Sequence, residues 1–351
     1  MPTVLTKDLS HFWEDNMTKL TLIGATALAT TLSVGAAFAA DHTITVSLDT
    51  SPQHVRNVWL KEFAAAVDEK SKGRLEIEIF EAAAKYKDSE AAAAVAQGAI
   101  DMAIPQYQLV SRFVPEADFE QLPMFYGLGR DQIYAVVDGT VGDALHERIE
   151  AKLPVEVLGR PIDLGFGTVF STDTELKTPG DLAGLKVRVP GGPATVQRYE
   201  AMDSVPVQIS WPDVPQALQT GTVSSLWATQ ESVASAKLWD AGVKYAMEDR
   251  QAIVQYVPLV NRRALEALPE DLRTLFVDTW DEMVDGQRDF AAQRQQDARD
   301  LNAENGIVTA VPTDEDLDAM RQRLMGVQPA LVEELGIDPE FITQLSDAIG
   351  D

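Results

Sequence analysis

One stretch of this chain constrains its fold more than any other. Between Pro269 and Pro312 there is no proline, and apolar residues recur at spacings of three, four and seven. These residues are Leu272, Leu275, Phe276, Trp280, Met283, Val284 and Phe290. The periodicity predicts one amphipathic helix of about 35 residues, about 50 Å long at about 1.5 Å per residue. A helix of that length needs a body of comparable length to cover its apolar face.

The rest of the chain alternates between strand and helix patterns. Apolar residues at every second position predict strands at 43–48, 75–79, 100–104, 185–189, 205–209 and 224–227. Helical periodicity predicts helices at 55–70, 89–97, 194–202, 214–220 and 231–241, with short surface helices after Asp314. Such alternation is typical of an α/β fold with a parallel or mixed sheet.

The N-terminus has the pattern of an export signal. Residues 17–40 contain one lysine, an apolar stretch and the small-residue sequence Ala37-Phe38-Ala39, which is typical of a cleavable signal peptide. The acidic segment before Met17 does not suit such a signal, so Met17 is the expected initiator. We therefore assign residues 1–39 to a leader and expect a secreted protein without a membrane-spanning segment. The roughly 310 remaining residues suffice for two lobes and a cleft between them.

Composition excludes several classes of partner. The chain has no cysteine, so it has no disulfide, thiol nucleophile or thiolate metal site. It carries 55 acidic and 29 basic residues, and nucleic acids and anionic membrane surfaces would repel it. An anionic ligand therefore needs a local positive site.

Sequence signatures of enzymes are absent. The chain contains no nucleophile elbow, no H-E-x-x-H and no phosphate-binding loop, and its histidines are not spaced for a metal. We expect no cofactor and no metal. A periplasmic hydrolase or lyase using two carboxylates stays open, and a close acid pair with one raised pKa would support it.

Arg188 is the most informative single residue. It lies in the middle of a predicted strand, between Val187 and Val189, and is followed by a Pro-Gly-Gly turn. An arginine in this position can project into a cleft and hold a carboxylate through two parallel hydrogen bonds. Judged on spacing alone, the residue fits a structural salt bridge or an exposed strand face better than a ligand anchor.

Six segments, taken in order, resemble the solute-binding subunits of TRAP (tripartite ATP-independent periplasmic) transporters of the DctP type. They are KSKGRLEIEIFEAA, EAAAAVAQGAIDMAI, FVPEADFEQLPMFYG, KTPGDLAGLKVRVPGG, VPVQISWPDVPQALQTGTV and NRRALEALPEDLRTLF. The resemblance implies a two-lobed periplasmic solute-binding fold, with crossing segments and one long helix along both lobes. It also implies closure around a ligand by a hinge motion.

The expected lobes are discontinuous in sequence. Residues 40–165 with about 254–293 form the first lobe, and residues 166–253 with about 294–351 form the second. The ligand cleft lies between them. We expect a monomer.

The resemblance also implies ligand contacts. Arg188 matches the arginine that anchors the ligand carboxylate, Asp49 and Gln106 match polar contacts, and Trp211 matches an aromatic residue that covers the ligand. Asp49 could instead serve as a helix N-cap or turn residue, and Trp211 as ordinary packing. We expect His54, at the start of a helix, to face solvent.

Two positions depart from the family pattern. Where many relatives have a second arginine, this chain has Thr168 or Val169, and Trp227 lies where relatives have polar residues. The site is therefore less basic and more aromatic than a dicarboxylate site. We expect a small organic acid with one anchoring carboxylate, delivered to TRAP membrane subunits. A zwitterionic compatible solute or an amino acid is the alternative ligand, and a signalling subunit is the alternative role.

Overall fold

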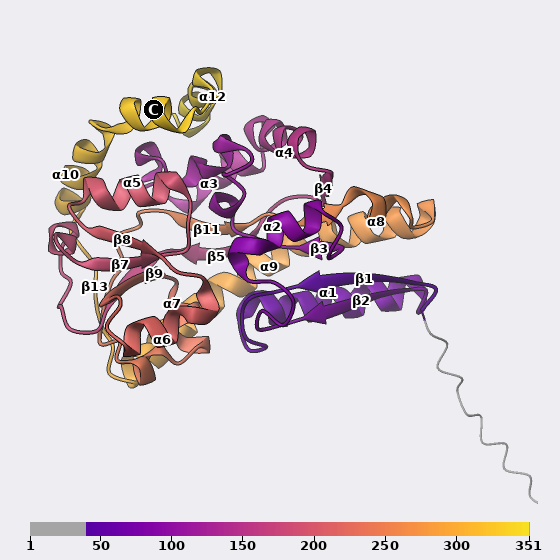
Figure 1. The fold of residues 1–351 in the computed structure, drawn as a ribbon, viewed down its shortest axis with the longest axis horizontal. Coiled ribbons are helices and arrows are strands. Elements are labelled where there is room, and N and C mark those ends of the chain that lie inside the picture. The colour runs from indigo at the N-terminus through magenta and orange to yellow at the C-terminus, as the bar shows by residue number, and fades with distance from the viewer. Residues whose placement is uncertain (1–39, 351) are drawn as a thin grey trace, which may run out of the picture. The chain divides into compact units, whose positions relative to one another are not determined.

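The structure, a computed structural model, describes residues 40–350, all within one compact unit. The predicted leader, including Met17, lies outside the described residues. Helices and strands alternate along the described chain and build two main sheets (Figure 1). The predicted mixed α/β class is confirmed.

The first sheet has five strands in the order β2-β1-β3-β12-β4. Its strands are β1 (His42–Ser47), β2 (Leu75–Phe80), β3 (Met102–Ala103), β4 (Val155–Val157) and β12 (Leu259–Asn261). β1 runs parallel to β2 and β3, whereas β12 runs antiparallel to β3 and β4. The middle of this sheet thus contains a strand that comes late in the sequence.

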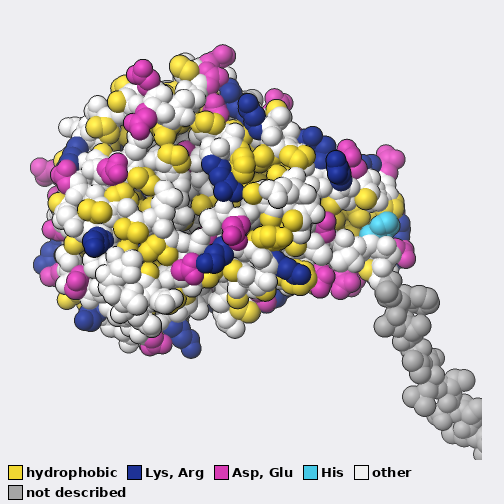
Figure 2. All heavy atoms as spheres, viewed as in Figure 1, with side chains coloured by type: hydrophobic (Ala, Val, Ile, Leu, Met, Phe, Trp, Pro, Cys, Tyr) yellow, Lys and Arg dark blue, Asp and Glu magenta, His cyan; other side chains and the backbone are white. Residues whose placement is uncertain are grey.

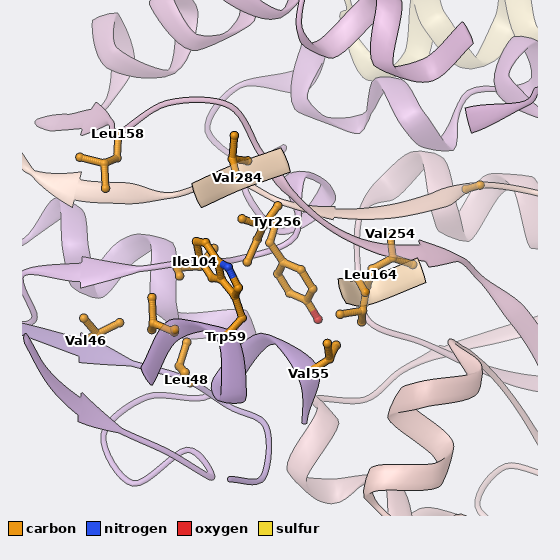
Figure 3. Packing of buried hydrophobic residues seen from close by; sticks show 14 of the residues in the cluster. Val46, Leu48, Val55, Trp59, Ile104, Leu158, Leu164, Val254, Tyr256 and Val284 are labelled. Atoms are coloured by element: carbon orange, nitrogen blue, oxygen red, sulfur yellow. The ribbon is translucent and has the colours of Figure 1, made fainter. Parts of the chain in front are cut away.

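The predicted long helix is α9 (Glu270–Glu304), which has 35 residues. It packs along α1 (Val55–Ser71), where Trp59 and Phe63 meet Trp280 with ring centroids 5.2 and 5.3 Å apart. Figure 3 shows Trp59 within this core, near Ile104 and Tyr256. Aromatic packing of this kind contributes beyond the area that it buries.

The second sheet has six strands in the order β13-β10-β6-β9-β7-β8. Its strands are β6 (Thr168–Ser171), β7 (Lys186–Val189), β8 (Val205–Gln208), β9 (Ser225–Ala228), β10 (Tyr245–Met247) and β13 (Val308–Ala310). β7 is parallel to β8 and β9, and β6 is antiparallel to β9 and β10.

Three segments connect the two sheets. β5 (Ile162–Phe166) leads into β6, β11 (Ile253–Tyr256) leads back toward β12, and α9 leads on to β13. β5 and β11 pair antiparallel and lie between the main sheets in Figure 1. Gly167 follows β5, and a Cβ atom there would lie 2.0 Å from Nε1 of Trp227. Only glycine fits this crossing beside the indole.

The remaining helices cover the sheets. They are α2 (Asp88–Ala96), α3 (Arg130–Val137), α4 (Thr140–Lys152), α5 (Pro193–Ala201), α6 (Val214–Gln219), α7 (Gln230–Ser235), α8 (Arg262–Glu266), α10 (Asp314–Met325), α11 (Gln328–Leu335) and α12 (Pro339–Ile349). α7 is shorter than predicted, because Lys237 adopts a left-handed conformation and a separate 3-10 turn follows. α12 packs against α3 and α4.

The predicted lobe ranges divide the strands as the two sheets do, but α12, placed in the second range, packs against α3 and α4 of the first. All strands of the first sheet lie within 40–165 and 254–293, and all strands of the second lie within 166–253 and 294–351. The lobe boundaries themselves stay a prediction. Within residues 40–350, none of the helices combines the length and hydrophobicity needed to cross a bilayer.

Candidate functional site

A cavity with an empty volume of about 380 Å³ is lined by strands of the second sheet, by the crossing strands and, on the side of the first sheet, by segments that follow its strands. Its lining residues are Asp49, Thr50, Asp88, Gln106, Leu164, Arg188, Pro190, Trp211, Trp227, Ala228, Thr229, Ser232, Val254 and Tyr256. Five of the six predicted site residues belong to this set: Arg188, Asp49, Gln106, Trp211 and Trp227. Thr168 does not, and lines a separate pocket instead.

Arg188 is fixed in place by backbone carbonyl groups. β7 carries it between two buried valines, and its Nε donates to the carbonyl of Ile209 at 2.8 Å and its Nη1 to that of Trp227 at 3.3 Å. Burial lowers the pKa of the guanidinium, which nevertheless stays protonated. A guanidinium has five N–H donors, so three are left for a ligand. Nη2 lies 3.8 Å from Oδ2 of Asp88.

Asp49 forms an ion pair with a second buried arginine. Nη2 of Arg56 lies 2.5 Å from Oδ1 of Asp49, and its Nη1 donates to the carbonyl of Ile104 at 3.0 Å. The Arg56 guanidinium also lies over the ring of Tyr256, 4.3 Å from its centre. Asp49 does not cap α1, because His54 does. The N-cap alternative for Asp49 was therefore wrong.

Asp88 is a cavity residue that sequence reasoning missed. It begins α2, and its Oδ2 accepts a hydrogen bond from the backbone N–H of Trp211 at 3.1 Å. Burial raises the pKa of Asp88, the nearby Asp49 raises it further, and Arg188 lowers it. Two acids with one raised pKa are the arrangement named above as support for a hydrolase. Here both carboxylates are already held by protein donors.

Three aromatic rings line the cavity. Trp227 is fully buried, and Trp211 places its ring centre 5.5 Å from the Arg188 guanidinium. Tyr256 on β11 was also missed from the sequence, and its hydroxyl accepts from Nε2 of Gln106 at 3.4 Å. Figure 3 shows this hydroxyl directed between Val55 and Leu164. The cavity thus offers a fixed cation beside flat apolar surfaces.

His54 is buried, so the expectation that it faces solvent was wrong. Its Nδ1 accepts from the backbone N–H of Arg56 at 3.2 Å, and its Nε2 lies 3.1 Å from Oγ of Ser232 and 3.3 Å from Oε2 of Glu231. Oε1 of Glu231 accepts from the backbone N–H of Val55 at 2.9 Å. These contacts, here called the Glu231 clasp, join the start of α1 to α7.

Neither side chain of the clasp is held in its charged form. Burial lowers the pKa of His54 well below its usual value, and Arg56 and Arg294 add to the effect. Burial raises the pKa of Glu231 to about 7, although the Val55 N–H, Arg294 and Arg56 oppose the rise. The His54–Glu231 contact is therefore a close approach of two side chains and not a full ion pair at neutral pH.

Known proteins are similar to this chain in sequence and in fold. The profile of "Bacterial extracellular solute-binding protein, family 7" (DctP) matches residues 46–334. The C4-dicarboxylate-binding periplasmic protein DctP of Rhodobacter capsulatus is 27% identical over 323 residues, covering 90% of this chain and 94% of that protein.

Solved structures agree with the sequence comparison. A TRAP periplasmic solute-binding protein of Sulfurospirillum deleyianum with bound succinate superimposes with a TM-score of 0.80 at 22% identity, covering 88% of this chain and 99% of the other. The sugar acid binding protein DctPAm of Advenella mimigardefordensis, in complex with galactonate, gives a TM-score of 0.83 at 18% identity, covering 89% and 98%. These relatives are binding proteins and not enzymes. The chain belongs to the DctP family of bacterial extracellular solute-binding proteins, the solute-binding components of TRAP transporters.

Proposed function

We propose that this chain captures a small organic acid through one anchoring carboxylate and delivers it to TRAP membrane subunits. The supporting observation is the buried Arg188, whose guanidinium is fixed by two carbonyls and keeps N–H donors on the side of the cavity. Two parallel charge-assisted hydrogen bonds to a carboxylate fit this geometry. The rings of Trp211, Trp227 and Tyr256 would cover an apolar or ring-shaped remainder.

The charges around the cavity favour one carboxylate over two. Arg56 and Arg188 are balanced by Asp49 and Asp88, and Arg56 is already engaged by Asp49. A second ligand carboxylate would meet Asp88 without a free arginine beside it. The Thr168 position offers no replacement, because that residue lines another pocket.

Ligand contacts from both sides of the cavity would drive closure. Arg188 comes from the second sheet and Gln106 follows β3 of the first, so a ligand touching both favours the closed form. Direct contacts already join the two sides, including Lys87 to Asp213 at 2.6 Å. We assign the moving bodies to residues 40–165 with 254–293 and residues 166–253 with 294–351.

A zwitterion is the second candidate ligand. Asp88 and Asp49 lie in the same cavity as Arg188, and aromatic rings surround them. An ammonium group can be held by carboxylates and by the faces of aromatic rings, while the carboxylate of the same molecule binds the arginine. The balanced charges of the cavity suit a ligand without net charge.

Export completes the proposal. Residues 17–39 would act as a cleavable signal peptide, and the mature chain would work in the periplasm as a monomer. Its relatives named above are periplasmic, which supports this location. Two adjacent membrane-protein genes would support transport, whereas an adjacent sensor kinase would favour the signalling role.

Thermal unfolding against a ligand library tests the function. The chain from Ala40 onward is heated with monocarboxylates, dicarboxylates, sugar acids, amino acids and compatible solutes. A ligand at 100 times its dissociation constant should add about 2.7 kcal/mol to the free energy of unfolding. The shift should vanish in Arg188→Ala and persist in Arg263→Ala, whose arginine is exposed on α8. A shift that survives Arg188→Ala would refute the anchor.

Asp88→Asn separates the two ligand classes. Removing this charge should tighten the binding of a monocarboxylate, because a nearby negative charge is lost. It should weaken the binding of a zwitterion, because a partner of the ammonium group is lost. Calorimetric titration with the best library hit measures the change.

A further inference from the structure

A second pocket lies where the chain crosses between the two sheets. Its empty volume is about 660 Å³, and it shares no lining residue with the ligand cavity. All three crossings contribute: residues 165–168 between β5 and β6, residues 248–250 between β10 and β11, and residues 292–299 of α9. Arg130 of α3 and Gln230 of α7 complete the lining. We call it the crossing pocket.

Three arginines from different elements line the crossing pocket, against one glutamate. They are Arg130, Arg250 and Arg299, and the glutamate is Glu248. The whole chain carries a formal net charge of −26, so this concentration of arginine is unusual for the molecule. On the face shown in Figure 2, basic side chains are interspersed with acidic ones.

The guanidinium groups of these arginines keep most of their donors. Nε of Arg130 lies 3.6 Å from Asp163, Nε of Arg299 lies 3.4 Å from Glu248, and Nη2 of Arg250 donates to Asp314 at 3.4 Å. Each guanidinium has five N–H donors. Within residues 40–350, the long Arg250 contact is their one hydrogen bond.

Two of the three acidic neighbours are engaged by other donors. Asp163 is buried, and it accepts from the hydroxyl of Tyr134 and the backbone N–H of Gly165, both at 2.5 Å. Glu248 accepts from Nε2 of Gln230 at 2.9 Å. The third, Asp314, is 93% exposed, so its pair with Arg250 is screened by water. The arginines therefore lack strong acceptors of their own.

We propose that the crossing pocket binds a small multivalent oxyanion, a phosphate or a di- or tricarboxylate, and that this anion stabilises the closed form. Guanidinium groups bind both kinds of oxyanion through paired N–H donors. An anion held between Arg130, Arg250 and Arg299 would tie together segments from both predicted lobes.

The location of the crossing pocket explains how a bound anion would stabilise the closed form. Gly165, at φ +89°, lies at the end of β5 with Nη2 of Arg130 3.8 Å from its Cβ position and Cγ of Gln295 3.0 Å from it. The Arg130 guanidinium thus lies close to Gly165, where the chain crosses. Because the three crossings must rearrange for the lobes to separate, an anion that joins them opposes opening.

Inorganic phosphate is the first probe, titrated calorimetrically at constant ionic strength into the chain from Ala40 onward. Arg130→Gln and Arg299→Gln should each weaken phosphate binding at least tenfold. Arg263→Gln should bind as the wild type does, because its arginine is exposed on α8 and lines neither pocket. A citrate titration into the same variants distinguishes a phosphate site from a carboxylate site. Binding of either anion to the wild type supports the proposal if Arg299→Gln loses it.

Three outcomes would overturn the proposal. The wild type could bind neither anion, the arginine variants could bind as well as the wild type, or binding could be lost in Arg188→Ala alone. The last result would place the anion in the ligand cavity. Arg299 is partly exposed, so its variant should fold, and circular dichroism checks this.

The effect on closure needs a ligand found in the library above. A saturating anion should tighten the binding of that ligand by about fivefold or more, the lower end of typical allosteric coupling. Arg299→Gln should abolish the tightening while leaving ligand affinity without the anion intact. Equal ligand affinity with and without bound anion would refute the coupling.

Discussion

Replacing Glu231 by glutamine should remove a specific part of the pH dependence of folding. The Glu231 clasp buries this carboxyl group between α1 and α7, with Oε1 bound to the Val55 N–H. Glutamine keeps an oxygen for that N–H and carries no group that titrates between pH 5 and 8. The variant should therefore retain the contact without a group that titrates.

The magnitude follows from the pKa. Burial raises the pKa of Glu231 from its ordinary value of 4.5 to about 7. Since the folded state binds the proton more tightly, its stability is greatest below pH 4.5 and falls as the pH rises through 7. Each pKa unit is worth about 1.4 kcal/mol, so the wild type should lose about 3 kcal/mol across this window through Glu231.

Urea unfolding of wild type and Glu231→Gln at pH 5, 6, 7 and 8 measures this loss. Burial also raises the pKa of Asp118 to about 7 and that of Asp249 to about 6, so both proteins should become less stable as the pH rises. Only the difference between their free energies of unfolding reports Glu231. The variant should gain in stability relative to the wild type as the pH rises to about 7. Parallel curves would refute the assignment of a neutral, buried Glu231.

Substitutions at four further sites, one of them a coupled pair, have defined outcomes. Gly167→Ala should lose about 1–3 kcal/mol in urea unfolding, because its Cβ atom would overlap an indole ring. Gly286→Ala in α9, where a Cβ meets no atom within 4 Å, should not be destabilising. Arg56→Met should cost about 3–5 kcal/mol by leaving Asp49 unpaired, and adding Asp49→Asn should recover part of that loss. Thr313→Ala should cost about 1 kcal/mol by removing the N-cap of α10, and a loss under 0.2 kcal/mol would contradict that role.

Periodic patterns predicted the helices and strands well, because the formation of these elements depends on local sequence. The apolar spacing after Pro269 predicted α9, and the alternation after Gly73 predicted β2. The end of α7 was misplaced, because the left-handed conformation of Lys237 leaves no sequence signal. Lysine rarely adopts that conformation.

The cavity could be predicted only in part. Arg188 was predicted as a cavity residue because it matches an arginine of the TRAP solute-binding family, and because a mid-strand position is compatible with a cleft. Asp88 was missed because an acid in the first turn of a helix usually serves the helix dipole alone. His54 was misjudged because its partners, Glu231 and Ser232, lie far along the chain and no local pattern connects them.

The position of β12 has a consequence for how the chain can fold as it is made. This strand lies between β3 and β4, so the first sheet stays incomplete until residues 259–261 have been synthesised. The surfaces of α3 and α4 stay uncovered for longer, because α12, which packs against them, comes later in the sequence. Contacts so distant in sequence form slowly. Under the export proposed above, a chain that cannot fold early would stay unfolded while it crosses the membrane, and it would reach its final structure only after α12 has emerged.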